Sequence, residues 1–178
     1  MSILKVARMG HPVLRSKAPA LNPAEIKSAA VQKLIDDMIE TMHEYRGIGL
    51  AATQVHERGR LFVAGIEEEE GSGGAQRELL VLVFINPEIK PVGGETTEDW
   101  EGCLSVPDLR GRVSRPSHVK VRALDRRGTR LEMDVRGHVA RVLQHEADHL
   151  DGKLFLDRMK SLDSLGYLEE FAKFRSRE

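Results

Sequence analysis

Residues 144–149 read Q-H-E-A-D-H and contain the pattern H-E-x-x-H. The pattern constrains the fold because residues i and i+4 lie on one face of a helix, one turn apart. Apolar residues recur at helical spacing around it, and Gly152 offers the left-handed residue that ends many helices. We therefore expect a helix over residues 136–151 that aims the imidazoles of His145 and His149 at one metal ion.

Glu146 follows the first histidine of the pair. A carboxylate at this position can act as a base on a water molecule bound to the metal, and can later return the proton to a departing amine. Carboxylates on helix surfaces are common, but between two ligand histidines we favour the catalytic interpretation. H-E-x-x-H also arises by chance on charged helices, so the third ligand becomes decisive.

A catalytic site of the zinc type needs three protein ligands and one open position. Metzincins place a third histidine six residues after the second, where this chain has Phe155. Gluzincins use a later glutamate, and Glu169 lies at about the right separation, although its helix-like surroundings favour a solvated charge. The third candidate is Cys103, the only cysteine. Lone cysteines are usually small buried apolar residues, so the residues alone leave this choice open.

Three further segments accompany the histidine pair. Residues 101–107 read E-G-C-L-S-V-P, residues 47–54 read G-I-G-L-A-A-T-Q, and residues 10–15 read G-H-P-V-L-R. In this order and spacing they closely resemble the peptide deformylase family, over about residues 3–157. The resemblance implies an α+β fold and an enzyme that removes the formyl group from the N-terminal formylmethionine of new polypeptides, with release of formate.

The resemblance also implies roles for individual residues. Metal ligands would be Cys103, His145 and His149, and Glu146 would carry the proton. Gln54 and the backbone N–H of Leu104 would hold the oxyanion, whereas a loop amide bonded to backbone is the alternative for Gln54. The predicted substrate-binding residues are Ile48, Gly49, Glu101, Gly102, Arg110, His138 and Val142.

Within that set, Gly49 would pair with the peptide main chain, and Ile48 would flank the metal. Glu101, His138 and Val142 would line the methionine pocket. Helical spacing is consistent with this pocket, because His138 and Val142 lie on the same helical stripe as the two predicted ligand histidines. Arg110 would lie near the mouth of the site, although a solvated surface arginine fits the sequence nearly as well.

One thiolate and two imidazoles admit ferrous iron as well as zinc, so the residues do not choose between these metals. The resemblance implies Fe(II) as the native metal, with Zn(II), Ni(II) or Co(II) as substitutes. A catalytically silent relative that binds formylated peptides, or that holds a structural metal, is a further alternative. The presence of both Glu146 and Gln54 argues against it, because a pure binder needs neither.

Composition sets the remaining limits. With 178 residues, 31% charged and 40% hydrophobic, the chain fits one globular domain over residues 1–178. The net charge of −1 gives no general attraction to nucleic acid or membrane. With no long apolar run, no signal-peptide core and a single cysteine, we expect a cytoplasmic protein. The partners are formyl-Met nascent peptides and a transient contact with the ribosome; the sequence leaves open a monomer or a weak dimer.

The pattern along the chain predicts antiparallel sheets packed around the central metal-binding helix, with an N-terminal and a C-terminal helix. Asn22 and Pro23 resemble a helix start, for a helix that runs to about Tyr45. An acidic and then glycine-rich segment over residues 67–74 reads as a surface loop that looks inserted. The other expected elements are an irregular arm at 3–20, strands at 60–66 and 79–85, a hairpin of 118–125 with 129–135, a turn or bulged strand end at 102–107, and a helix at 162–175.

Overall fold

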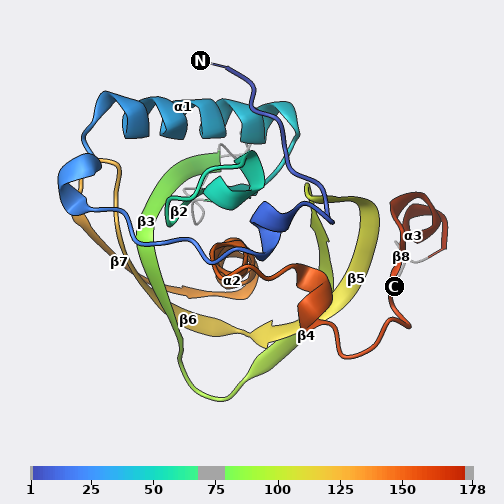
Figure 1. The fold of residues 1–178 in the computed structure, drawn as a ribbon. Coiled ribbons are helices and arrows are strands. Elements are labelled where there is room, and N and C mark those ends of the chain that lie inside the picture. The colour runs from blue at the N-terminus through green and yellow to red at the C-terminus, as the bar shows by residue number, and fades with distance from the viewer. Residues whose placement is uncertain (1, 68–78, 175–178) are drawn as a thin grey trace, which may run out of the picture.

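The computed structural model describes residues 2–67 and 79–174. Within these residues it forms two antiparallel sheets and three α-helices, which confirms the α+β prediction (Figure 1). The larger sheet contains, in spatial order, β1 (Gly49–Ala51), β2 (Leu61–Glu67), β3 (Leu79–Pro91), β6 (His118–Leu124) and β7 (Arg130–Arg136). The smaller sheet contains β4 (Thr96–Cys103), β5 (Val106–Pro116) and β8 (Gly166–Tyr167).

The helices are α1 (Ala29–Glu44), α2 (Gly137–Leu150) and α3 (Leu168–Phe174). Strand alternation explains why two of them use opposite faces of the larger sheet. Leu61 and Val63 pack in the cluster that holds the buried side of α1, whereas Phe62 and Ala64 pack in the cluster that holds α2. The view in Figure 1 is along the axis of α2, which lies between the two sheets.

The central helix is the element that the sequence predicts best. It runs from Gly137 to Leu150, against the expected 136–151. Ala140, Leu143 and Leu150 are buried against the sheet, as the helical stripe requires. Gly152 follows with φ +71°, and a Cβ there would lie 2.7 Å from the carbonyl oxygen of Arg15. Both the backbone conformation and the close approach therefore require glycine after the helix.

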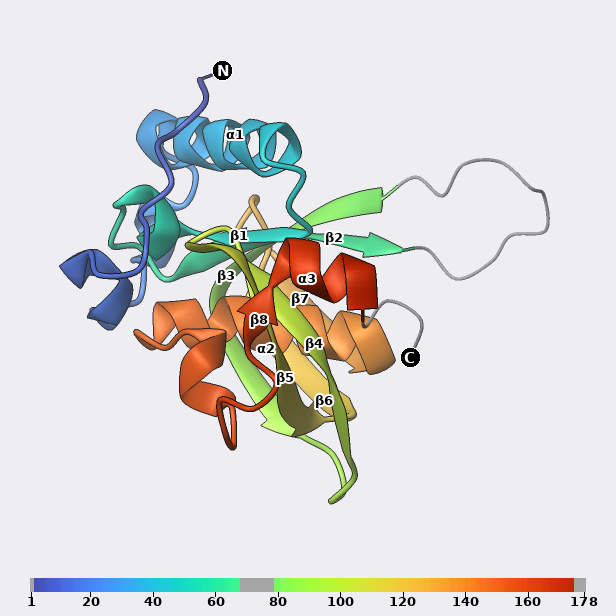
Figure 2. The same ribbon diagram turned by 90° about the vertical axis from the view of Figure 1, so that its right-hand side faces the viewer.

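The segment that carries Cys103 is a bulged hairpin. β4 and β5 pair in antiparallel fashion, and the register shifts between Glu101 and Cys103. The expected turn or bulged strand end is confirmed, but the two long strands on either side of it were not predicted. The hairpin is visible from the side in Figure 2, with α3 packed across it.

Two predicted helix starts are wrong. Asn22 does cap a turn, but that turn is the short 3-10 helix η2 (Pro23–Glu25), and α1 starts only after Ser28, whose hydroxyl accepts from Val31 N–H. The C-terminal helix begins at Leu168 and not near residue 162, because Gly166 and Tyr167 first pair with β5. The predicted loop at 67–74 lies almost wholly outside the described residues.

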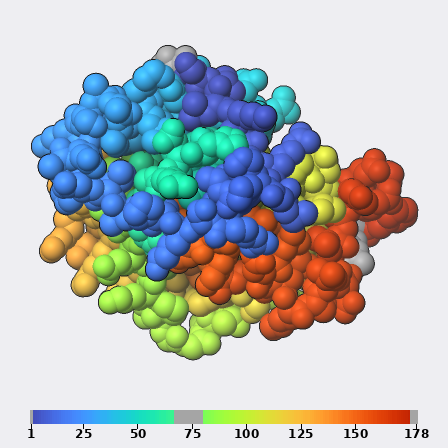
Figure 3. Space-filling view, in the orientation of Figure 1, coloured from blue at the N-terminus to red at the C-terminus, as the bar shows by residue number. Residues whose placement is uncertain are grey.

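The N-terminal arm is mostly irregular, as predicted, apart from the 3-10 helix η1 (Pro12–Arg15). It crosses the face shown in Figure 3 and joins separate parts of the chain. Its backbone N–H groups donate to carbonyls of Gln54, Ser105 and Leu150, at 2.7 to 2.8 Å. Gln54 is itself a predicted site residue, and Ser105 and Leu150 directly follow the predicted residues Leu104 and His149, so the arm helps to hold the site together. No helix among the described residues is long and apolar enough to cross a membrane.

Candidate metal centre and active site

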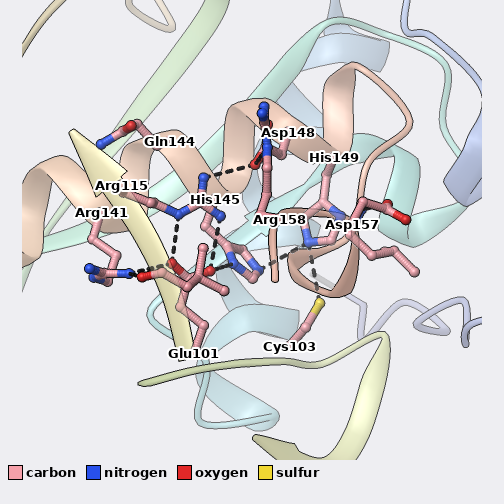
Figure 4. Close-up of polar contacts among 12 residues, drawn as sticks. Glu101, Cys103, Arg115, Arg141, Gln144, His145, Asp148, His149, Asp157 and Arg158 are labelled. Atoms are coloured by element: carbon pink, nitrogen blue, oxygen red, sulfur yellow. Dashed lines mark hydrogen bonds and ion pairs between the residues drawn. The ribbon is translucent and has the colours of Figure 1, made fainter. Parts of the chain in front are cut away.

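The structure brings the three predicted ligands together at the centre of the molecule (Figure 4). Their donor atoms all lie within 4.8 Å of one another. Nε2 of His149 lies 3.2 Å from Cys103 Sγ and 3.2 Å from His145 Nε2. Tetrahedral coordination at ordinary metal–ligand distances would separate such atoms by about 3.3 to 3.6 Å. The spacing therefore fits a single ion with a small adjustment.

The electrostatics of the cluster also fit a cation. Burial alone would raise the pKa of the Cys103 thiol, but the imidazoles of His149 and His145 hold it well below its usual range. Burial likewise lowers the pKa of His145, and hydrogen bonds to Cys103 and Glu101 overcome this and raise it. The cluster thus favours a thiolate beside a positive charge. A dication supplies that charge when it displaces the proton.

Glu146 lies beside this cluster, between α2 and β1. Its side chain is buried, and its Oε2 has no hydrogen-bond partner within the described residues. Burial raises the pKa of Glu146 to about 7, although the neighbouring His145 and His149 pull it down. A Cβ at Gly49 would lie 2.3 Å from Glu146 Oε1, so only glycine at that position leaves room for the carboxylate. The Glu146 carboxyl is therefore sterically confined, and its pKa lies near neutral pH.

Gln54 is held with its amide nitrogen toward the cluster. The backbone N–H of Ala51 donates to Gln54 Oε1 at 2.8 Å, which fixes which end of the amide points inward. Gln54 Nε2 then lies 3.5 Å from Cys103 Sγ and 3.2 Å from the Ser105 hydroxyl. Gln54 comes from the 3-10 helix η3 (Ala52–Val55), directly after β1. The amide is a fixed donor at the edge of the candidate ligand cluster.

Glu101 lies in a buried network of charges. Its carboxylate accepts from Arg115 Nε at 2.6 Å and Nη2 at 2.9 Å, and from Arg141 Nη1 at 2.8 Å. It also contacts Nδ1 of His145 at 2.9 Å. The resemblance places Glu101 at the methionine pocket, but here all four contacts join it to protein groups. Glu101 thus orients the imidazole of His145, one of the three predicted ligands.

The network continues beyond Glu101. Arg115 Nη1 donates to Asp148 Oδ2 at 2.8 Å, and Arg158 donates to both carboxylate oxygens of Asp148. These residues did not stand out in the sequence. Asp148 lies inside the H-E-x-x-H pattern and could have been noticed there. The pairing of Arg115 with Glu101 could not, because even the β4–β5 register places Arg115 opposite Thr97 and Glu101 opposite Gly111.

The other predicted site residues are more exposed to solvent. Ile48 and His138 are exposed, and Val142 is half-buried on the same stripe of α2 as the histidines. Arg110 covers Gly102 so closely that a Cβ on this glycine would overlap the guanidinium. Glu169, the alternative third ligand, is exposed on α3 and is not part of the ligand cluster found in the described residues.

Comparison with known proteins decides the family. A family model for polypeptide deformylase matches residues 3–164. The chain belongs to the polypeptide deformylase family. Peptide deformylases are metal-dependent hydrolases that remove the formyl group from the N-terminal formylmethionine of new polypeptides, and the chain shares this function.

Individual relatives match this chain over most of its length. The peptide deformylase of Hahella chejuensis is 44% identical over 162 residues, which cover 91% of this chain and 90% of that protein. The peptide deformylase of Pseudomonas aeruginosa is 43% identical over the same length and coverage. A crystal structure of a class I type b peptide deformylase from Acinetobacter baumannii, with Met-Ala-Ser bound, is 38% identical with a TM-score of 0.80. It covers 89% of this chain and 100% of that one.

Proposed function

We propose that Cys103, His145 and His149 hold the metal of this deformylase and that Glu146 moves the proton during hydrolysis of the formyl amide. The observation that carries the proposal is the buried cluster of one sulfur and two imidazole nitrogens within 4.8 Å, with the unpartnered Oε2 of Glu146 beside it. Three protein ligands leave a fourth position for water or substrate, as a catalytic site requires.

The native metal in this proposal is Fe(II), with Zn(II), Ni(II) or Co(II) as substitutes. The mixed sulfur and nitrogen donor set supports a borderline metal over Mg²⁺ or Ca²⁺, which prefer oxygen ligands. A dication bound there would polarise the formyl carbonyl and lower the pKa of water.

Glu146 accepts a proton from the attacking water and returns it to the leaving amine nitrogen. Burial supports the uptake of the proton, because it favours the neutral form of the Glu146 carboxyl over the ionised form. Confinement against Gly49 supports a fixed direction for Oε2.

Gln54 Nε2 and the backbone N–H of Leu104 stabilise the negative charge that develops on the formyl oxygen. The fixed orientation of the Gln54 amide supports this role, because a donor aligned in advance needs no reorganisation during the reaction. Leu104 directly follows a metal ligand on the β4–β5 hairpin, so its backbone lies at the site.

The substrate is an N-formyl-Met peptide that lies in extended form across the site. The backbone of Gly49 pairs with the peptide main chain, with Gly102 nearby, and Ile48 flanks the metal. His138 and Val142 contact the methionine side chain with their accessible surfaces. Arg110 lies at the mouth, above Gly102. Glu101 supports the pocket from behind, through His145. The Met-Ala-Ser peptide bound to the Acinetobacter baumannii relative supports a peptide of this kind.

In the cell we expect the protein to act in the cytoplasm on nascent chains, as a monomer or weak dimer, with at most transient contact with the ribosome.

The test of the activity is formate release from formyl-Met-Ala-Ser by protein purified without oxygen. We expect formate release that a chelator abolishes and added Fe(II) restores, and no reaction with acetyl-Met-Ala-Ser. Release that survives complete removal of metal would contradict the proposal.

A further inference from the structure

We propose that Arg141 is a positioning residue for the metal centre. It fixes the Glu101 carboxylate behind His145 and ties α2 to the β4–β5 hairpin, and so retards loss of the metal. The inference rests on the ligand set proposed above and concerns a residue that contacts neither a ligand nor, in our proposal, the substrate.

Protein donors occupy the acceptor positions of the Glu101 carboxylate. An ionised carboxylate offers about four lone-pair positions. Arg115 takes one on each oxygen, Arg141 takes the second on Oε1, and Nδ1 of His145 faces the second on Oε2. With three positions filled by arginine donors, the carboxylate cannot rotate, and its remaining position points at His145. His145 then donates through Nδ1 and keeps Nε2 for the metal.

Arg141 also donates to backbone carbonyls of both strands of the β4–β5 hairpin. Nη1 also donates to the carbonyl oxygen of Val113 at 2.8 Å, and Nη2 donates to that of Thr97 at 2.6 Å. These carbonyls belong to β5 and β4, whereas Arg141 itself is on α2. One guanidinium therefore links the helix that carries both histidines to the hairpin that carries Cys103 (Figure 4).

The two histidines differ in the hydrogen bonding of Nδ1. His145 is held from behind by Glu101, but Nδ1 of His149 is buried without a hydrogen-bond partner in the described part of the chain. The orientation of the two imidazoles thus depends on the contact between Glu101 and Nδ1 of His145. Mutation of a residue that hydrogen-bonds a metal ligand from behind typically changes metal affinity by 10- to 100-fold. We therefore expect an effect on metal affinity when the residues that hold Glu101 are changed.

The shape of arginine matters here because its planar fork serves three acceptors at once. Lysine keeps the charge but has a single nitrogen, so it cannot span Glu101, Val113 and Thr97 together. Methionine keeps most of the length and removes all donors. The two replacements separate charge from geometry.

The experiment measures the rate of Co(II) loss to excess chelator, together with the visible absorption spectrum of the Co(II) protein. We expect Arg141→Met to lose metal about tenfold faster than the unchanged protein and to shift the Co(II) bands. Arg141→Lys should lose metal at an intermediate rate, with a partly restored spectrum. In steady-state assays kcat should fall with little change in KM.

Arg60→Met is the matched control. Arg60 also ties α2 to its surroundings, through the Leu150 carbonyl at 3.4 Å and Asp151 at 2.8 Å, but it does not touch Glu101. We expect its rate of metal loss to stay within about twofold of the unchanged protein, since no partner of a ligand side chain is removed.

Equal rates for Arg141→Met and the unchanged protein, or an equal acceleration in Arg60→Met, would overturn the inference. If Arg141→Met does not fold, Arg141→Lys decides alone, and a rate equal to that of the unchanged protein refutes the proposal. Failure of the ligand set looks different, because Cys103→Ala would then bind Co(II) as tightly as the unchanged protein.

Discussion

Replacement of Gly49 by alanine tests whether the position of Glu146 governs the reaction. The new Cβ would lie 2.3 Å from Glu146 Oε1, 2.6 Å from Cδ and 2.7 Å from Cγ, whereas ordinary contacts begin at 3.4 Å. The carboxylate must therefore retreat by about 1 Å, and a misplacement of that size costs roughly 10²-fold in rate. This corresponds to about 3 kcal/mol in the barrier. The backbone of Gly49 is in an ordinary strand conformation, so alanine itself adds no backbone strain.

The assay is kcat for formate release at saturating formyl-Met-Ala-Ser, with metal content measured on the same samples. We expect Gly49→Ala to keep its metal, because Gly49 lies against Glu146 and not against a ligand. Gly94→Ala is the matched control, since a Cβ there meets nothing within 4 Å. A Gly49→Ala protein with kcat within threefold of the control would refute the reasoning that a fixed Glu146 is required.

Three other predictions concern the same centre. Gln54→Leu should lower kcat by about 10²- to 10³-fold at unchanged metal content, because one oxyanion donor is lost; a loss confined to KM would contradict this role. Cys103→Ala should abolish stoichiometric metal binding, measured by elemental analysis, whereas Glu169→Ala should not; the reverse result would favour the gluzincin arrangement. Ferrous protein should lose activity in air during timed assays while nickel-loaded protein persists, because Fe(II) with an open coordination position and the thiolate beside it both react with oxygen; equal stability at equal metal content would remove the argument for labile native iron.

The parts of the fold that the sequence predicted are those set by local pattern. α2 follows from the H-E-x-x-H spacing and its apolar stripe, and the β6–β7 hairpin follows from alternation around a glycine turn. The start of α1 was missed because two capping residues, Asn22 and Ser28, lie six positions apart and both cap a turn. Local sequence does not say which turn propagates, since that depends on burial of the later helix face.

The site shows the same division. The spacing of His145 and His149 fixes their approach within one helix, but the sulfur comes from a separate hairpin and was assigned by resemblance. Glu101 could not be placed from the sequence, because its surroundings depend on Arg115 from β5 and Arg141 from α2. A buried carboxylate reveals its function through partners that are distant in the sequence.

We propose that the metal held by Cys103, His145 and His149 and a proton-carrying Glu146 together perform the hydrolysis. Glu146→Gln tests it most directly, because the amide nearly preserves the shape of the side chain and cannot accept the proton of the attacking water. The measurement is formate release from formyl-Met-Ala-Ser, with metal content determined on the same sample. We predict one metal ion per chain and almost no formate. A variant that carries its metal and releases formate at nearly the rate of the unchanged protein would contradict the account.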